Sequence, residues 1–217
     1  MGGAILVLAT QKGGSGKSTA AACLAVHADL GGKRVALIDA DPQASLLHWR
    51  SLGEPPLDLR IDAEPSEAVG SHARRLAEGC DLVIIDTAGF RNRTMIEALS
   101  VADLALVPIK PSPLDIAAAL ETVKLIGEVN HVAERAGRQL RYRLFLTQVT
   151  VGSVIARHVR AELKEAGLAL LTAELANRVA YGEATLRGRM PAHLDAQGPA
   201  AREGAGFADE VLAALKP

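Results

Sequence analysis

Residues 11–19 read Gln11-Lys12-Gly13-Gly14-Ser15-Gly16-Lys17-Ser18-Thr19, and this stretch decides the fold. It follows the apolar run Ala4–Ala9 and opens a helical pattern over Ser18–Leu30, which is the setting of a phosphate-binding loop. Glycines let successive backbone N–H groups approach phosphate oxygens, and the helix N-terminus adds partial positive charge. We expect Lys17 to contact the β- and γ-phosphates of a nucleotide and Ser18 to bind Mg²⁺. The other expected phosphate contacts are Gly13, Gly14, Ser15, Gly16 and Thr19.

One lysine departs from the usual loop pattern G-x4-G-K-[ST]. The first glycine of that pattern would fall at Gln11, and Lys12 stands just before the glycine pair. Two lysines aimed at the same phosphates within one subunit are unusual, because like charges repel. The loop pattern alone therefore leaves the role of Lys12 open.

Carboxylates follow two further apolar runs. Asp39 ends the run Arg34–Asp39 and Asp41 follows two residues later, and residues at i and i+2 of an extended segment project to the same side. Beside a phosphate loop they can support Mg²⁺ and orient an attacking water. The alternative is a turn in which an aspartate caps a helix over Gln43–Trp49.

The run Leu82–Asp86 closes in an aspartate and continues as Thr87-Ala88-Gly89. We expect Asp86 to reach Mg²⁺, through water. Gly89 is a candidate γ-phosphate sensor, because a glycine backbone can approach a ligand closely.

Short apolar runs alternate with helical patterns along the whole chain. Strands that are apolar throughout and joined by helices indicate a parallel sheet covered on both faces. The fold class is therefore α/β, a doubly wound, mostly parallel sheet with helices on both faces, in one domain over residues 1–217. The least regular stretch, Leu52–Pro65, is predicted to be a surface connection. The expected strands are Ala4–Ala9, Arg34–Asp39, Asp81–Asp86, Leu104–Pro108 and Tyr142–Thr147, and the expected helices are Ser18–Leu30, Pro65–Glu78, Arg91–Val101, Leu114–Arg135, Ser153–Ala166 and Ala208–Leu215.

Composition favours a soluble, cytoplasmic protein. Hydrophobic residues make up 49% of the 217 residues, no apolar run approaches the roughly 20 residues of a membrane helix, and no secretory signal is seen. Cys23 and Cys80 lack metal-ligand spacing and fit reduced thiols. The net charge of −1 hides an asymmetry, because residues 131–202 carry 11 Lys or Arg against 6 Asp or Glu. This basic excess permits an anionic partner.

Three segments together resemble the ParA/MinD family of deviant Walker A ATPases. They are KGGSGKST, DADPQAS and VIIDTAG, and Ala102–Ala117 is similar to the small ParA-type partition ATPases. The resemblance covers nearly the whole chain and weakens after Thr150. It implies a P-loop NTPase domain that binds ATP and Mg²⁺, hydrolyses ATP, and forms a face-to-face homodimer. It also implies that Lys12 crosses to the partner's nucleotide, which would remove the repulsion between the two lysines.

The resemblance assigns roles to individual residues. Lys12, Lys17 and Asp41 would be catalytic, with Asp41 positioning the attacking water, and Ser18, Asp39 and Asp86 would serve the metal. Pro108, Pro111 and Pro113 would border the nucleotide and the dimer interface. Thr147 and Gln148 would end the strand whose following loop faces the adenine.

The resemblance also implies partners. ParA-type members bind DNA non-specifically when ATP-bound, associate with the nucleoid, and position a cargo with an activating adaptor of the ParB type. The chain starts almost directly at a strand, so no N-terminal DNA-reading domain is expected. The tail Gly206–Pro217 carries two acids and one lysine, which favours a docked helix over a membrane anchor. The alternatives are a MinD-like membrane-associated positioning ATPase and a P-loop metabolic enzyme.

Basic residues in the C-terminal third are candidates for DNA contact. Arg157, Arg160 and Lys164 recur at helical spacing, and Arg178, Arg187 and Arg189 follow. Such arginines also occur on ordinary solvated faces. The regional charge excess favours binding to the phosphate backbone, which needs charge but no base readout.

Overall fold

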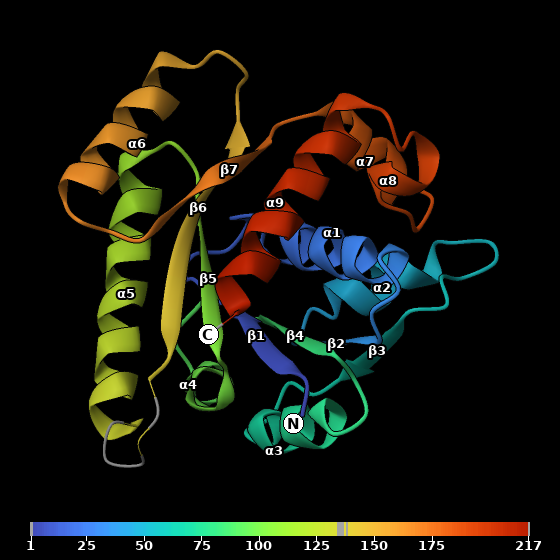
Figure 1. Cartoon of the computed structure of the whole chain (residues 1–217), viewed down its shortest axis with the longest axis horizontal. Coiled ribbons are helices and arrows are strands. Elements are labelled where there is room, and N and C mark those ends of the chain that lie inside the picture. The colour runs from blue at the N-terminus through green and yellow to red at the C-terminus, as the bar shows by residue number, and fades with distance from the viewer. Residues whose placement is uncertain (1, 134–136, 138, 217) are drawn as a thin grey trace.

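The computed structural model describes residues 2–133, 137 and 139–216, which form one seven-stranded parallel sheet flanked by helices (Figure 1). The strand order is β3-β2-β4-β1-β5-β6-β7, so β1 lies at the centre between β4 and β5. The carboxyl ends of the strands lie toward the top of Figure 1. The strands are β1 (Ala4–Leu8), β2 (Val35–Ala40), β3 (Arg60–Ala63), β4 (Leu82–Thr87), β5 (Leu104–Ile109), β6 (Arg141–Val149) and β7 (Leu170–Ala176).

The central strands are apolar on both sides because the sheet separates two hydrophobic cores. In β1, Ile5 and Val7 belong to one core, whereas Leu6 and Leu8 belong to the other. Alternate side chains of a strand point to opposite faces, so an uninterrupted apolar run fills both cores. This confirms the doubly wound α/β class predicted from the sequence.

The helices divide between the two faces of the sheet (Figure 1). One core is covered by α3 (Val69–Ala77), α4 (Arg93–Val101), α5 (Pro113–Ala133) and α6 (Val154–Glu165). The other is covered by α1 (Lys17–Leu30), α2 (Ser45–Ser51), α7 (Val179–Thr185), α8 (Pro191–Leu194) and α9 (Pro199–Leu215).

The structure differs from the sequence-based expectation at both edges of the sheet. Residues 52–65 were predicted to be a surface connection, yet they contain β3, an edge strand that pairs with β2 and buries Ile61. The strand β7 and the helices α7 and α8 were not predicted. These segments are short or rich in alanine, so their apolar periodicity is weak, and pairing with a neighbouring strand decides their structure. The expected helix end at Arg135 lies outside the described residues.

The C-terminal helix packs against the sheet, as the charge of the tail predicts, and it begins nine residues earlier than expected, at Pro199. Phe207 is fully buried against Phe145 of β6, with ring centroids 4.8 Å apart. Ala208 and Val211 are also fully buried. The apolar side of α9 is therefore part of the core. None of the described helices is long and apolar enough to cross a membrane.

We expect Phe207→Ala to destabilise the protein by roughly 3–5 kcal/mol, because it empties a closely packed site under α9. Leu194→Ala is the control, since Leu194 of α8 is 45% exposed and its truncation should cost less than about 1 kcal/mol. Urea unfolding followed by circular dichroism measures both values. Equal losses in the two variants would show that α9 does not contribute to the core.

Candidate functional site

The glycine-rich loop lies at the carboxyl end of the central strand β1 and leads directly into α1. Gly14 and Gly16 have φ angles of 68° and 86°, a backbone region that residues with a Cβ rarely adopt. Lys17 is the first residue of α1, so the N-terminus of that helix opens onto the loop. Backbone N–H groups and the helix dipole together form an anion site of the kind the sequence predicts.

Asp86 is the most deeply buried acid of this site. It is the second-last residue of β4 and is paired in register with Asp39 of the adjacent strand β2. Neither carboxylate oxygen of Asp86 has a hydrogen-bond partner. Burial raises the pKa of Asp86 to about 7, although the Ser18 hydroxyl and the Lys17 ammonium act in the opposite direction.

Lys17 lies close to these acids but forms no ion pair among the described residues. Its side chain is 6% exposed, and burial lowers its pKa against the opposing influence of Asp86 and Asp41. Burying an unpaired charge costs several kcal/mol unless a partner is supplied. A phosphate would pair with Lys17 and a cation would pair with Asp86.

The unsatisfied polar atoms fit a magnesium–phosphate group. Apart from the Asp86 oxygens, the Ser15 hydroxyl is also buried without a hydrogen-bond partner. Mg²⁺ is commonly held by one or two carboxylates together with phosphate oxygens and water. Accordingly, the described part of the chain has no cluster of three or more acidic, histidine or cysteine side chains that would hold a metal alone. Ser18 and Asp86 are the residues that could hold the ion together with phosphate oxygens and water.

Asp39 and Asp41 occupy different environments. The Asp39 carboxylate accepts hydrogen bonds from the backbone N–H of Leu46, at 2.8 Å, and of Leu47, at 3.2 Å, so it caps the start of α2. Burial raises the pKa of Asp39 despite these bonds. Asp41 is partly exposed and accepts a bond from Gln43 N–H. The capping role considered from the sequence therefore belongs to Asp39, while Asp41 faces the site more freely.

Gly89 lies directly against the phosphate loop. A Cβ added to Gly89 would fall 2.7 Å from both the nitrogen and the Cα of Gly13. Real Cβ atoms do not approach backbone so closely, so only glycine fits without moving the loop. The segment after β4 is thus in contact with the segment after β1.

Lys12 contacts a different part of the structure from Lys17. Its ammonium lies 2.6 Å from the Asp115 carboxylate in the first turn of α5. Burial would raise the pKa of Asp115, but hydrogen bonds from Lys12 and Ser112 outweigh it and hold the pKa below its ordinary value. Asp115 follows Pro111 and Pro113 and was not singled out in the sequence, because an aspartate in a first helical turn is common.

A cavity of about 520 Å³ adjoins the phosphate loop. Gly16, Thr19, Thr147 and Gln148 line it, so the structure brings the predicted strand end together with the predicted loop. Pro111 does not line this cavity. The remaining wall comes from the end of β7 and from α7, which the sequence did not reveal; it includes Asn177, Arg178, Val179, Tyr181, Glu183 and Leu186.

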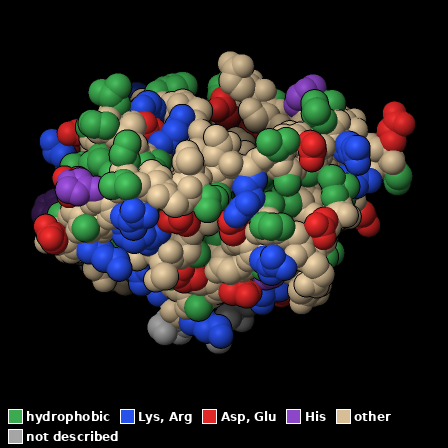
Figure 2. Space-filling view, turned by 90° about the horizontal axis from the view of Figure 1, so that it is seen from above, with side chains coloured by type: hydrophobic (Ala, Val, Ile, Leu, Met, Phe, Trp, Pro, Cys, Tyr) green, Lys and Arg blue, Asp and Glu red, His purple; other side chains and the backbone are tan. Residues whose placement is uncertain are grey.

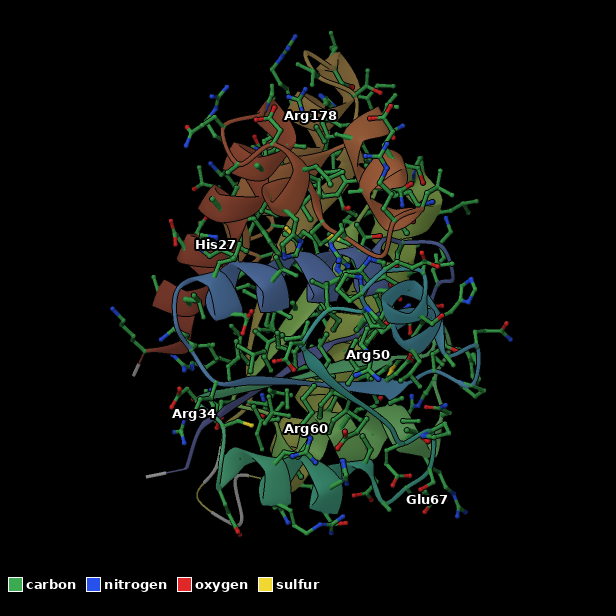
Figure 3. The ribbon with its side chains drawn as sticks, turned by 90° about the vertical axis from the view of Figure 1, so that its right-hand side faces the viewer. His27, Arg34, Arg50, Arg60, Glu67 and Arg178 are labelled. Atoms are coloured by element: carbon green, nitrogen blue, oxygen red, sulfur yellow. The ribbon has the colours of Figure 1, made fainter. Side chains whose placement is uncertain are left out.

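The six candidate DNA-contacting residues fall into two groups. Arg160 forms an ion pair with Glu174, at 2.7 Å. Arg178, which Figure 3 labels, forms a bidentate pair with Glu203 of α9. Arg189 donates to the carbonyl groups of Gly188 and Pro55. The other three are exposed and take part in none of the ion pairs among the described residues; they are Arg157, Lys164 and Arg187.

The face at the carboxyl ends of the strands carries mixed side chains. Figure 2, which views the molecule from above, shows basic and apolar side chains intermixed on the left, over α5 and α6. Exposed large apolar residues follow several strand ends; they are Phe90, Leu114, Val151, Val154, Ile155, Val179 and Leu186.

Comparison with known proteins identifies relatives with the same loop and strand arrangement. The family model of the CobQ/CobB/MinD/ParA nucleotide binding domain matches residues 6–192. The protein ParA of Rhizobium radiobacter is 32% identical over 183 residues, which cover 82% of this chain and 80% of the relative. The maintenance of carboxysome distribution protein A of Halothiobacillus neapolitanus is 28% identical over 201 residues, 91% of each chain.

Solved structures share the fold at lower identity. A Cyanothece McdA variant in complex with ATP has a TM-score of 0.74 and 19% identity, and the match covers 97% of this chain and 96% of that one. Cobyrinic acid a,c-diamide synthase of Mycobacterium smegmatis, with a bound ATP analog and magnesium, has a TM-score of 0.76 and 18% identity, covering 99% and 96%. At this identity the likeness establishes the fold alone.

We expect Gly89→Ala to weaken nucleotide binding about tenfold or more, because the added methyl group must displace the loop at a cost of about 1–3 kcal/mol. Calorimetric titration with Mg-nucleotide measures the change. Gly127→Ala is the control, since a Cβ at this position of α5 meets no atom within 4 Å. Affinity that stays unchanged in Gly89→Ala would argue against contact between the two segments in the bound state.

Proposed function

Since the chain belongs to the CobQ/CobB/MinD/ParA family of nucleotide-binding domains, we propose that it is a ParA-type positioning ATPase. It binds Mg-ATP, dimerises through the nucleotide face, and attaches non-specifically to DNA in the ATP-bound state. An adaptor protein of the ParB type stimulates hydrolysis and links the ATPase to its cargo. The relatives that support this proposal act in partition or in carboxysome distribution, as their names state.

The observation that carries the proposal is the separation of the two loop lysines. Lys17 lies among Asp41 and Asp86, on the β2 and β4 side of β1, whereas Lys12 pairs with Asp115 on the β5 side. Because Lys12 lies away from the phosphate site of its own subunit, it is available to bind the phosphates of a second subunit. This arrangement supports a dimer in which Lys12 neutralises charge on the partner's nucleotide.

The chemistry follows from the same geometry. Lys17 and the loop N–H groups bind the phosphates, Ser18 and Asp86 hold Mg²⁺ with Asp39 behind them, and Asp41 orients the attacking water. When bound, Mg²⁺ would neutralise phosphate charge and so lower the barrier to attack. Gly89 contacts the loop and responds to the γ-phosphate.

The surface around the nucleotide site supports an interface. Exposed apolar residues occur beside three strand ends, including Phe90 after β4, Leu114 after β5 and Val154 after β6. Burying them against a second copy would stabilise a dimer by about 25 cal/mol per Å² of apolar surface, before the costs of association. A two-fold interface would repeat each contact.

Lys12 must leave Asp115 before it can reach a partner subunit. We therefore expect Lys12→Ala to bind ATP as a monomer without dimerising, whereas Asp115→Asn should dimerise at an ATP concentration about tenfold lower than wild type. The second effect follows because a hydrogen bond between charged groups contributes about 1.5–3 kcal/mol. Light scattering after size exclusion measures both, with Asp41→Ala in the background to suppress turnover.

The matched control is Lys124→Ala, which removes an exposed lysine from α5 and should change nothing. A Lys12→Ala variant that dimerises as well as its background would reject the shared nucleotide interface. An Asp115→Asn variant that needs more ATP would show instead that Asp115 orients Lys12 toward the partner.

DNA attachment rests on the exposed basic residues of the C-terminal third. We expect Arg157→Glu with Lys164→Glu to weaken DNA binding by tenfold or more in ATP without changing ATP affinity, because two contacts to DNA phosphates are replaced by repulsion. The dependence of DNA affinity on salt concentration should fall as well. Fluorescence anisotropy with two unrelated duplexes across a salt series measures this.

The control variant, Lys33→Glu with Arg74→Glu, reverses the charge of two exposed basic residues elsewhere on the surface. Its DNA affinity should stay within about twofold of wild type. Wild-type protein that ignores DNA in ATP at low salt would reject the DNA-bound function. Co-sedimentation with anionic vesicles then tests the membrane-associated alternative, and turnover of an added carboxylate substrate tests the metabolic one.

A further inference from the structure

Gln148 has an unusual backbone conformation at the end of β6. Its φ angle is 52°, and Ala44 is the only other non-glycine residue among those described with a positive φ. The β6–β7 register shifts between Thr147 and Val149, so Gln148 lies at a bulge. A left-handed residue with a side chain costs about 1–2 kcal/mol, and glycine or asparagine would adopt the conformation more easily. Such strain at a site margin suggests that the side chain has a function.

The side chain of Gln148 contacts the phosphate loop. Its amide Nε2 donates to the carbonyl oxygen of Gly14 at 3.0 Å. The preceding residue, Thr147, is buried beside Gly16, where an added Cβ would lie 3.0 Å from the threonine hydroxyl. Two successive residues of β6 therefore touch two glycines of the loop.

Fixing the Gly14 carbonyl also fixes the next backbone N–H. The Gly14 C=O and the Ser15 N–H belong to one planar trans peptide and point in opposite directions. Ser15 is buried, but Gly14 is exposed and has open space where a Cβ would be, so packing holds the Gly14 side of this peptide only weakly. A single hydrogen bond from Gln148 can therefore select its orientation.

We infer that Gln148 is a positioning residue for phosphate binding: its strained backbone aims the amide at Gly14, which holds the Ser15 N–H ready for phosphate. This inference rests on the proposed ATP binding and changes the role expected for Gln148 from the sequence. Although Gln148 lines the cavity, one of the two N–H groups of its amide is donated to the carbonyl oxygen of Gly14 in the loop. The residue acts on the phosphates through Gly14 rather than on the base.

Three substitutions distinguish the effect of the Gln148 amide group from the effect of its strained backbone. Gln148→Ala removes the amide and keeps the strained φ, Gln148→Gly removes both, and Gln148→Glu keeps the size but replaces the donor by an acceptor. Thr150→Ala, an exposed residue two positions further on, is the control. Calorimetry with Mg-ATP and with Mg-tripolyphosphate measures affinity, thermal unfolding measures stability, and steady-state turnover gives kcat and KM.

We expect Gln148→Ala and Gln148→Gly to lose roughly fivefold in affinity, equally for the two ligands, as loss of one neutral hydrogen bond implies. Gln148→Glu should lose more for both ligands, because its carboxylate also repels the phosphates. KM should rise by a similar factor with kcat nearly unchanged, because the contact is made in both ground and transition states. Gln148→Gly should unfold at the wild-type temperature or above it, since glycine relieves the strain. A purely structural role would instead lower the unfolding temperature and leave affinity intact.

Two results would overturn the inference about Gln148 and leave the proposed function standing. One is wild-type affinity for both ligands in Gln148→Gly, and the other is a loss confined to Mg-ATP, which would indicate a contact with the base or sugar. Wild-type protein that binds neither ligand would overturn the proposed function, and this inference with it.

Discussion

The structure depends on a buried lysine and a buried aspartate that face one site without contacting each other. Lys17 begins α1 just after the loop that follows β1, Asp86 lies near the end of β4, and no ion pair joins the two among the described residues. Such burial is unfavourable in the isolated chain. A phosphate beside Lys17 and a divalent cation beside Asp86 would offset the cost of burying these two groups.

The rest of the fold holds these charges in place. The central position of β1, between β4 and β5, brings the loop and Asp86 together, and the two hydrophobic cores fix the strands from both sides. Gly89 allows the segment after β4 to touch the loop, and Thr147 supports it from β6. Contacts from both sides thus limit the movement of a loop whose own glycines would leave it mobile.

Two side chains connect this site to the wider surface. Lys12 extends to Asp115 at the start of α5, next to the exposed apolar residues that border the nucleotide face. Gln148 connects the wall of the cavity to Gly14. The start of α5 and the wall of the cavity are therefore both connected to one short loop by direct side-chain contacts.

The sequence by itself determined the fold class and located the glycine-rich loop and the aspartates near the strand ends, because these features depend on local patterns. Apolar runs of strand length, a glycine-rich turn before a helix, and aspartates at strand ends each leave a signal within a few residues. Only the tertiary structure decided the features that depend on distant partners. The edge strands β3 and β7 form by pairing, Asp39 caps α2 across the turn, and Arg160, Arg178 and Arg189 find acidic or carbonyl partners elsewhere in the chain. The contacts of Lys12 with Asp115 and of Gln148 with Gly14 span 103 and 134 residues, and no short sequence window contains both members of either pair.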